Sequence, residues 1–399
     1  MKKMLAASVL AFSVSPAPLS APPAGAPTPV TAPPSAASPV PASPVPASPV
    51  PASPVPALPA PTGAYPVGET NLHLIDSSRP DPWVTGRDVR ELMVSVWYPA
   101  RRGGGRLAPY VTPRESELII RAVPQLDGVP ADTLARTTTH ARADAPALRR
   151  KSGWPLVVLS PGMSLPRATM TSLAEEFASR GYLVAGIEHT YESVATTFPD
   201  GRTVTFEAGK AGQTAETGAK VARVRAADTE FVLDRLSRSK RWNRLIDERN
   251  IAMVGHSAGG QSAAHLLAVS RRIKAAVNLD GTYNPRTPAR PLDKPFMMVG
   301  NPRHQPRAGG RDSSWEEFWP HVTGGWKRWL TVTGAEHMSF ADYAVLQPQL
   351  GLPGAALDGE RAVTITRRYV TAFLDLHLKG RRQPLLDRPS GDFPEVRIW

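Results

Sequence analysis

The sequence predicts an α/β fold in which a mostly parallel central sheet carries helices on both faces. Short apolar runs typical of buried strands recur along the chain, and longer segments with helical periodicity separate them. Strands are expected at residues 92–98, 154–160, 182–187, 251–254, 273–279, 295–300 and 329–334, and helices at 168–180, 215–236 and 361–378. A Gly-x-Ser-x-Gly motif lies between one of these strands and a helical segment, which supports the same fold class.

One part of the chain is expected at the margin of this sheet, and another is expected to form a hairpin. The run at 92–98 ends at Pro99 and has an alternating pattern, so it is predicted to belong to an antiparallel edge. Residues 194–198 and 203–206 flank the turn sequence Pro-Asp-Gly-Arg, which predicts a β-hairpin.

Residues 255–259, Gly-His-Ser-Ala-Gly, form the most informative motif of the chain. They directly follow the apolar run 251–254, and a helix-like segment follows them, which is the context of an α/β-hydrolase nucleophile elbow. On such a turn Ser257 projects its hydroxyl above the sheet, and a Cβ at Gly255 or Gly259 would collide with the neighbouring strand or helix. We therefore expect Ser257 to be a nucleophile; the alternative is a glycine-rich turn with a structural serine.

A nucleophilic serine requires a general base and a carboxylate that orients it, and α/β-hydrolases supply these in the order Ser, Asp or Glu, His. Asp280 ends the strand expected at 273–279, at the carboxyl end where such folds place their sites, and is the predicted acid. A turn or helix cap is the alternative for Asp280, because Asp before Gly is a common turn pair. His337 follows the strand at 329–334 and is the predicted base.

The chain has nine histidines, and the other eight lack this position. His256 lies within the motif and is expected to point away from the Ser257 hydroxyl, whereas His265 is expected to pack within the following helix. Surface or structural roles are expected for His73, His140, His304, His321 and His377. Glu188-His189 suggests a metal pair, but no further ligands stand at a suitable spacing, so neither a metal nor a cofactor is expected.

Two backbone amides are predicted to form the oxyanion hole. One is the amide of Ala258, which follows the nucleophile. The other is expected from the loop after the strand at 154–160, where Pro161 has no N–H, Gly162 allows a turn and Met163 presents its amide. The alternative for this loop is an ordinary connection between a strand and a helix.

These residues resemble a known family, the secreted (plasma-type) platelet-activating-factor acetylhydrolases with their bacterial lipase and esterase relatives. The resemblance extends over about residues 70–380 and is carried by the segments 155–163, 182–189, 225–228, 254–260, 278–281 and 336–342. It implies an ester hydrolase in which Ser257, Asp280, His337 and the Met163 amide perform the reaction. The chain departs from the family at Pro161, where members often carry His, and this departure concerns the loop shape and the acyl preference.

The composition predicts three segments along the chain. Residues 1–26 have the features of a signal peptide, because Lys2 and Lys3 precede an apolar run too short to span a bilayer. Residues 27–62 form a Pro/Ala/Ser-rich linker with repeats of Ser-Pro-Val-Pro-Ala, and the prolines prevent helix and sheet. Residues 63–399 suffice for one catalytic domain. We expect a secreted protein without a transmembrane anchor, whose linker is either a spacer at the cell wall or a plain tether.

Charge and cysteine content narrow the possible partners. The formal net charge of +12 favours anionic surfaces such as lipid headgroups or cell-wall polymers. Nucleic acid is not an expected partner, because the chain has no recognition motif and no interleaved basic and aromatic stripe. The chain contains no cysteine, so disulfides and thiol chemistry have no place in it.

The predicted function is that of a secreted serine esterase or lipase acting on short-chain esters, including the sn-2 acetyl group of platelet-activating-factor-like phospholipids. A polyester-degrading (cutinase-like) esterase, a prolyl-type peptidase and a non-enzymatic surface protein on a hydrolase scaffold remain alternatives. Between residues 303 and 326 an aromatic group either lines an acyl pocket, touches a lipid surface or, as favoured, packs in the core: Trp315, Phe318, Trp319 and Trp326.

Overall fold

The computed structural model describes residues 55–306 and 311–399. The predicted signal peptide at 1–26 and residues 27–54 of the predicted linker at 27–62 lie outside these residues. Residues 55–399 form one compact unit, which contains every element described below. No helix of this described part is long and apolar enough to cross a membrane.

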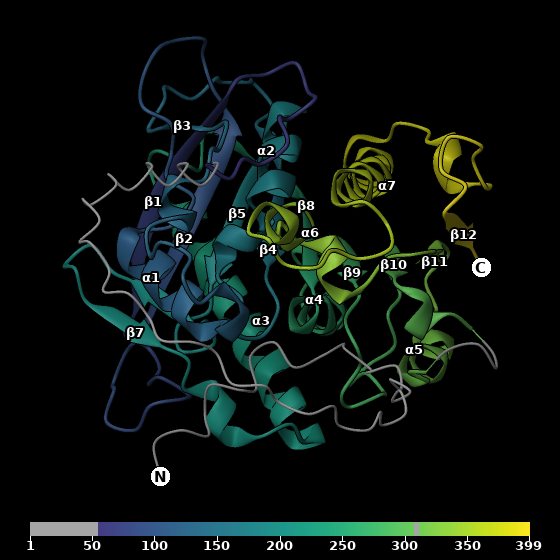
Figure 1. Ribbon diagram of the computed structural model, residues 1–399. Helices are drawn as coiled ribbons and strands as arrows, with labels where there is room; N and C mark the ends of the chain where they lie inside the picture. Colours follow the sequence, from purple (N-terminus) through teal and green to yellow (C-terminus); the bar gives the residue numbers. More distant parts are fainter. Residues whose placement is uncertain (1–54, 307–310) are drawn as a thin grey trace, which may run out of the picture. The chain divides into compact units, whose positions relative to one another are not determined.

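A ten-stranded sheet runs through this unit in the order β12-β11-β10-β9-β8-β4-β5-β2-β1-β3 (Figure 1). Its strands are β1 (Val67–Asp76), β2 (Arg90–Pro99), β3 (Arg142–Ala143), β4 (Trp154–Ser160), β5 (Leu183–Glu188), β8 (Ile246–His256), β9 (Ile273–Leu279), β10 (Phe296–Gly300), β11 (Lys327–Val332) and β12 (Val396–Ile398). All pairs from β5 through β11 are parallel, whereas β2 pairs antiparallel with both β1 and β5, and β12 pairs antiparallel with β11. The predicted α/β-hydrolase class with its antiparallel edge is therefore confirmed.

The predicted hairpin is also present, as the separate pair β6 (Ala195–Thr197) and β7 (Thr203–Thr205). The helices are α1 (Pro113–Ala122), α2 (Thr171–Ser179), α3 (Ala215–Arg238), α4 (Ala258–Val269), α5 (Ser314–Phe318), α6 (Tyr343–Gln349) and α7 (Gly359–Lys379). Two short 3₁₀ turns bear on the site, η3 (Arg167–Met170) and η8 (His337–Phe340).

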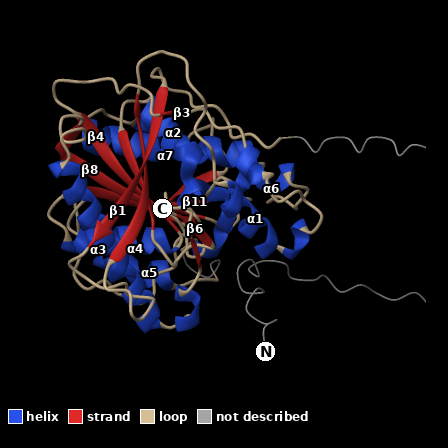
Figure 2. Cartoon of the chain, turned by 90° about the vertical axis from the view of Figure 1, so that its left-hand side faces the viewer, coloured by secondary structure: helices blue, strands red, loops and turns tan. Residues whose placement is uncertain are grey.

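Two hydrophobic cores lie on opposite faces of the sheet, and helices cover both (Figure 2). The alternation of side chains along a strand divides β4 between them, since Val157 and Leu159 join one core while Leu156 and Val158 join the other. Helices α2 and α7 pack over the first core, and α3 and α4 over the second. Burial on both faces explains why these strands are continuously apolar.

The aromatic group between residues 303 and 326 packs in the core, as favoured. Trp315 and Phe318 are buried, with Trp315 donating through Nε1 to the Gly281 carbonyl at 2.8 Å. Trp319 and Trp326 are partly buried and pack against the two cores.

The compact unit begins before residue 63, so residues 55–62 belong to it and not to a free linker. The guanidinium of Arg367 on α7 donates to the carbonyls of Pro59 and Ala60 at 2.9 and 2.8 Å, and Leu58 is buried. Thr62 donates through its amide and its hydroxyl to Glu176 at 2.7 Å each. These acceptors and donors come from distant parts of the chain, which is why local composition misplaced the boundary.

Candidate active site

The parallel strands β4, β8, β9, β10 and β11 lie side by side in the sheet (Figure 1), so their carboxyl ends lie on the same side of it. The predicted site residues follow these ends. Ser257 follows β8, Asp280 follows β9, and His337 lies on the connection after β11. The topology therefore brings residues together that stand up to eighty positions apart in sequence.

Ser257 sits on a strained turn between β8 and α4. Its backbone has φ 56° and ψ −122°, a conformation that side chains rarely adopt. Its amide donates to the Leu279 carbonyl at 2.8 Å, which ties the turn to β9. A Cβ on Gly255 would lie 2.0 Å from the Gly259 carbonyl oxygen, and a Cβ on Gly259 would lie 2.0 Å from that of Ser160. The collisions predicted at both glycines are confirmed.

The three side chains predicted as nucleophile, base and acid form one hydrogen-bonded line. His337 Nε2 lies 3.0 Å from Ser257 Oγ, and His337 Nδ1 lies 2.7 Å from Asp280 Oδ2. The His337 side chain is 35% exposed, whereas that of Asp280 is 1% exposed. A substrate can therefore approach the Ser257 and His337 end of the line, while the carboxylate is shielded from water.

Asp280 is held by the segment that follows β10. The amide of Asn301 donates to Asp280 Oδ1 at 2.7 Å, and Asn301 Nδ2 donates to Oδ2 at 2.9 Å. Burial acts to raise the pKa of Asp280, but the hydrogen bond with His337, the nearby His304 and the Asn301 amide outweigh it, so that this pKa lies below its usual value. The carboxylate is thus kept ionised beside the imidazole.

Asn301 is a site residue that the sequence argument did not identify. It stands directly after the strand predicted at 295–300, at the same edge as the other site residues. A polar residue at the end of a central strand was the available signal.

His256 contacts His337, the predicted base. Its Nε2 lies 2.9 Å from the His337 carbonyl oxygen, and the two rings are 4.8 Å apart between centroids. Burial, together with the neighbouring His337, lowers the pKa of His256 to about 3, so its imidazole is neutral and donates this hydrogen bond. It does not bond the Ser257 hydroxyl, as its predicted orientation requires.

Two further predictions concern His304, for which a surface or structural role is expected, and the Glu188-His189 pair. His304 is buried, stacks on Trp315 at 4.4 Å between ring centroids and lies 3.6 Å from Asp280 Oδ1, so it borders the site. Glu188 pairs with Arg167 at 3.1 Å, and His189 bonds Asp228 and Ser160, so both side chains already have protein partners.

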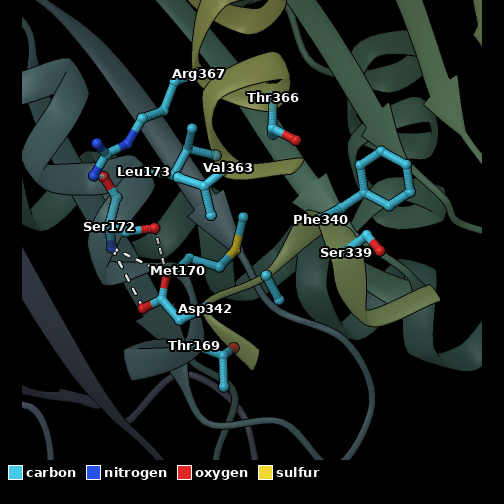
Figure 3. Close-up of a pocket in the computed structure, with 11 residues that line it drawn as sticks. Thr169, Met170, Ser172, Leu173, Ser339, Phe340, Asp342, Val363, Thr366 and Arg367 are labelled. Atoms are coloured by element: carbon cyan, nitrogen blue, oxygen red, sulfur yellow. Dashed lines mark hydrogen bonds between the residues drawn. The ribbon is translucent and has the colours of Figure 1, made fainter. Parts of the chain in front are cut away.

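Asp342 anchors the loop that carries His337 to helix α2 (Figure 3). Its carboxylate accepts from the Ser172 amide at 3.1 Å and from the Ser172 hydroxyl at 2.5 Å, and its own amide donates to the Thr169 carbonyl at 2.7 Å. A small cavity behind the loop is lined by residues of η3, α2, η8 and α7, and Arg367 borders it (Figure 3). Asp342 and its partners therefore fix η8, on which the imidazole depends.

The predicted oxyanion loop lies close to Ser257, the predicted nucleophile. A Cβ on Gly162 would lie 3.2 Å from Ser257 Cβ and 3.3 Å from His256 Nδ1, so only glycine fits there without a shift. Ala258 is the first residue of α4, and the amide of a first helical residue has no acceptor within its own helix. The helix N-terminus also favours negative charge at this point.

The sequence profile of the family "Platelet-activating factor acetylhydrolase, isoform II" matches residues 52–230 and 213–383 of the chain. The chain belongs to this family. Membership agrees with the resemblance carried by the elbow and by the segments that hold Asp280 and His337, and it makes the chain an ester hydrolase.

Named relatives support the assignment to the acetylhydrolase family. A probable 1-alkyl-2-acetylglycerophosphocholine esterase of Arthroderma benhamiae is 26% identical over 84% of the chain and 91% of the relative. A platelet-activating factor acetylhydrolase of Gallus gallus is 24% identical over 61% of the chain and 67% of the relative. Among solved structures, a ferulic acid esterase from Streptomyces cinnamoneus matches with a TM-score of 0.74 and 39% identity, over 86% of this chain and 99% of the other.

The buried carboxyl of Asp342 leads to a prediction on pH-dependent stability. Burial raises its pKa from 3.8 to about 7, although Ser172 and Arg367 oppose the shift. Between about pH 4 and about pH 7 the folded state thus keeps a proton that the unfolded state releases, and stability falls as the pH rises. Asp342→Asn replaces the carboxyl with an amide that does not titrate. The free energy of unfolding of the wild type, relative to that of the variant, should therefore fall as the pH rises from about 4 to about 7.

Urea unfolding at several pH values measures this difference. Asp387→Asn, which removes a half-exposed carboxylate paired with Arg328, is the control and should keep the wild-type slope. Equal slopes for the wild type and Asp342→Asn would contradict the prediction.

Proposed function

We propose that the chain is a secreted serine esterase that hydrolyses short-chain carboxylic esters through an acyl-enzyme, including the sn-2 acetyl group of platelet-activating-factor-like phospholipids. The observation that carries the proposal is the hydrogen-bonded line from Asp280 through His337 to Ser257. The names of the acetylhydrolase relatives support the acyl group.

In the acylation step Ser257 Oγ attacks the ester carbonyl carbon while His337 Nε2 takes the hydroxyl proton. The ionised carboxylate of Asp280 keeps Nδ1 protonated and stabilises the imidazolium that forms. The carbon–oxygen bond to the alcohol then breaks, and His337 returns the proton to the departing oxygen. Base, orienting group and nucleophile stand at 2.7 and 3.0 Å from one another, within the range for direct proton transfer.

The tetrahedral intermediate carries a negative oxygen, for which we assign the amides of Met163 and Ala258 as donors. Each donor of this kind contributes about 3 kcal/mol to transition-state stabilisation. The support is the position of Ala258 at the start of α4 and the approach of Gly162 to Ser257. Water, deprotonated by His337, then attacks the acyl group, and the released proton returns to Ser257 as the acid leaves.

A second candidate function is the hydrolysis of ferulic acid esters. It is favoured by the 39% identity to the ferulic acid esterase of Streptomyces cinnamoneus, which exceeds the identity to the two acetylhydrolase-type relatives. The same triad serves both reactions, because each forms an acyl-enzyme from a carboxylic ester. Polyesters and prolyl peptides are the remaining substrate classes.

The catalytic role of Ser257 is tested by Ser257→Ala. The hydroxyl is the attacking group, so the variant should lose about 10⁶-fold in kcat and should no longer react with a fluorophosphonate probe. Ser237→Ala, which removes a hydroxyl of α3 that accepts from Arg272 at 2.8 Å, is the matched control and should keep wild-type activity.

Circular dichroism checks that the variant is folded. A folded Ser257→Ala enzyme with near-native kcat would refute the assignment of the triad. A wild-type protein that never reacts with the probe would favour the non-enzymatic scaffold.

Acyl preference is tested by kcat/KM on p-nitrophenyl esters from acetate to palmitate, on 1-alkyl-2-acetylglycerophosphocholine and on methyl ferulate. We expect the acetyl esters to be turned over fastest. A rise toward palmitate would indicate a lipase, and a clear preference for methyl ferulate would establish the second candidate. Turnover confined to peptides or polyesters would overturn the proposal.

Secretion is tested by the amino terminus of the protein from its native host. If residues 1–26 are a signal peptide, the exported protein should begin near Pro22 or Pro27. N-terminal sequencing of protein recovered from the medium or the cell wall measures this. A cytosolic protein that retains Met1 would contradict the proposed location.

A further inference from the structure

A cluster of buried charged and polar side chains packs against the predicted oxyanion loop and has no part in the mechanism above. We call it the buried arginine network, and its members are Asp81, Arg90, Ser160, His189, Glu192, Arg225 and Asp228. Each member is at most 8% exposed. Removing so many charges from water is costly, so the arrangement calls for a functional explanation.

Arg225 on α3 is the member that contacts the loop. Its Nη1 donates to the Pro161 carbonyl and to Ser160 Oγ, the latter at 3.2 Å, and its Nη2 lies 3.5 Å from the Gly162 carbonyl oxygen. The guanidinium therefore reaches two successive carbonyls of the segment that leads to Met163.

The orientation of these carbonyls determines where the amides point. A trans peptide unit is planar, so its C=O and its N–H point in opposite directions. The Gly162 carbonyl is held by Arg225 and also accepts from the Leu165 amide at 3.3 Å. The Met163 N–H, which belongs to the same peptide unit, is consequently directed away from Arg225.

The nucleophile lies close to Gly162. The shortest approaches of a Cβ built on Gly162 are to Leu165 at 2.9 Å and to Ser257 Cβ at 3.2 Å. The loop thus lies in contact range of Ser257 while its carbonyls are bound by the guanidinium of Arg225.

We propose that Arg225 is the positioning residue of the oxyanion hole: its buried guanidinium binds the Pro161 and Gly162 carbonyls and so directs the Met163 amide toward the oxygen that becomes negative. This inference rests on the proposed ester-hydrolase mechanism. Arg225 touches neither substrate nor reacting atoms, and it acts only through the loop.

The rest of the network holds the guanidinium in place. Glu192 accepts from Arg225 Nε at 2.8 Å, and its backbone carbonyl accepts from the Ser164 amide at 2.7 Å. Glu192 therefore ties both the arginine and the far end of the loop to the segment after β5. Three successive peptide units of the loop are therefore held, two by Arg225 on α3 and the next by the Glu192 carbonyl.

A second Ser–His–Asp line is formed by Ser160, His189 and Asp228. Ser160 Oγ lies 3.0 Å from His189 Nε2, and His189 Nδ1 lies 2.8 Å from Asp228 Oδ2. It does not supply a nucleophile, because Ser160 is fully buried and its oxygen also accepts from Arg225. Burial, aided by the charge of Arg225, lowers the pKa of His189, so its imidazole is neutral and links Ser160 to Asp228. Arg90 donates to both carboxylate oxygens of Asp228 at 3.2 and 2.8 Å, which completes the line.

The test is Arg225→Lys, which keeps the positive charge and loses the planar fork that reaches two carbonyls. The donor stabilises the oxygen only when it becomes negative in the transition state. If the Met163 amide is misdirected, kcat should therefore fall about 10- to 100-fold while KM changes by less than about threefold. Rates on p-nitrophenyl acetate are expressed per active site titrated with a fluorophosphonate, so that a smaller folded fraction does not count. The affinity for a trifluoromethyl ketone, which forms a tetrahedral oxyanion on Ser257, should fall in parallel with kcat/KM.

Two further variants keep the test decisive. Glu192→Gln preserves size but removes the charge that fixes Arg225 Nε, and kcat per site should fall by about 3- to 10-fold. Asp81→Asn is the matched control, because Asp81 accepts from Arg90 at 2.8 Å within the same network but does not contact the loop. It should lower stability and leave kcat per site unchanged.

The measurements distinguish a failure of this inference from a failure of the proposed function. Wild-type kcat per site and wild-type ketone affinity in folded Arg225→Lys and Glu192→Gln would overturn the inference, and if Arg225→Lys does not fold, Glu192→Gln decides alone. An equal loss of kcat in Asp81→Asn would also overturn it, because the effect would then be general to the network. If the wild type hydrolyses no ester, the proposed function fails, while the ketone affinities still score the inference.

Discussion

The contact between the elbow and strand β4 is the constraint on which the rest of the site depends. Gly259 packs so closely on the end of β4 that a Cβ would lie 2.0 Å from the Ser160 carbonyl oxygen and 2.8 Å from that of Pro161. The start of α4 and the oxyanion loop can approach each other only because this residue has no side chain. The distance between Ser257 and both proposed oxyanion donors follows from this one contact.

Strain at the site is held by packing and by hydrogen bonds from neighbouring strands. Ser257 and Asp280 both have φ 56°, and each amide donates to a carbonyl of the next strand, Leu279 at 2.8 Å and Val299 at 2.9 Å. Two further residues with positive φ, Ser164 and Tyr191, flank the loop and the segment after β5. Such conformations are costly, and they persist where the surrounding structure determines them.

In the proposed role of the buried arginine network, buried charges position a loop without taking part in the chemistry. Burial acts to raise the pKa of Asp228, but Arg90 and His189 hold that pKa well below its usual range. Breaking such a pair leaves an uncompensated buried charge. The free-energy cost of that charge is far larger than the net stabilisation that the intact pair provides. A loop held by this network therefore has few alternative positions. Without these contacts, the connection between β4 and α2 would be free to adopt more of them.

Part of this arrangement could be predicted from the sequence and part could not. Ser257 and Asp280 directly follow a strand, and His337 lies on the connection shortly after one, so the apolar runs and the turn residues located them. The positions of Asn301 and of Arg225 in the site depend on side chains that meet across different elements, as does the docking of residues 55–62 on Arg367, about three hundred positions away. A single sequence records the residues of such pairs but not their pairing.

The substrate is the property that this core determines least. Relatives named as acetylhydrolases and a relative named as a ferulic acid esterase match the same chain, and acetyl and feruloyl groups differ greatly in size. The proposed triad and the residues that hold it lie at strand ends and on buried side chains, and their proposed role concerns the ester bond common to all these substrates. Acyl selection must therefore come from groups outside the hydrogen-bonded line. Pro161, whose carbonyl accepts from Arg225, lies in the loop that leads to the proposed donor Met163, so the shape of this loop affects the position of that donor.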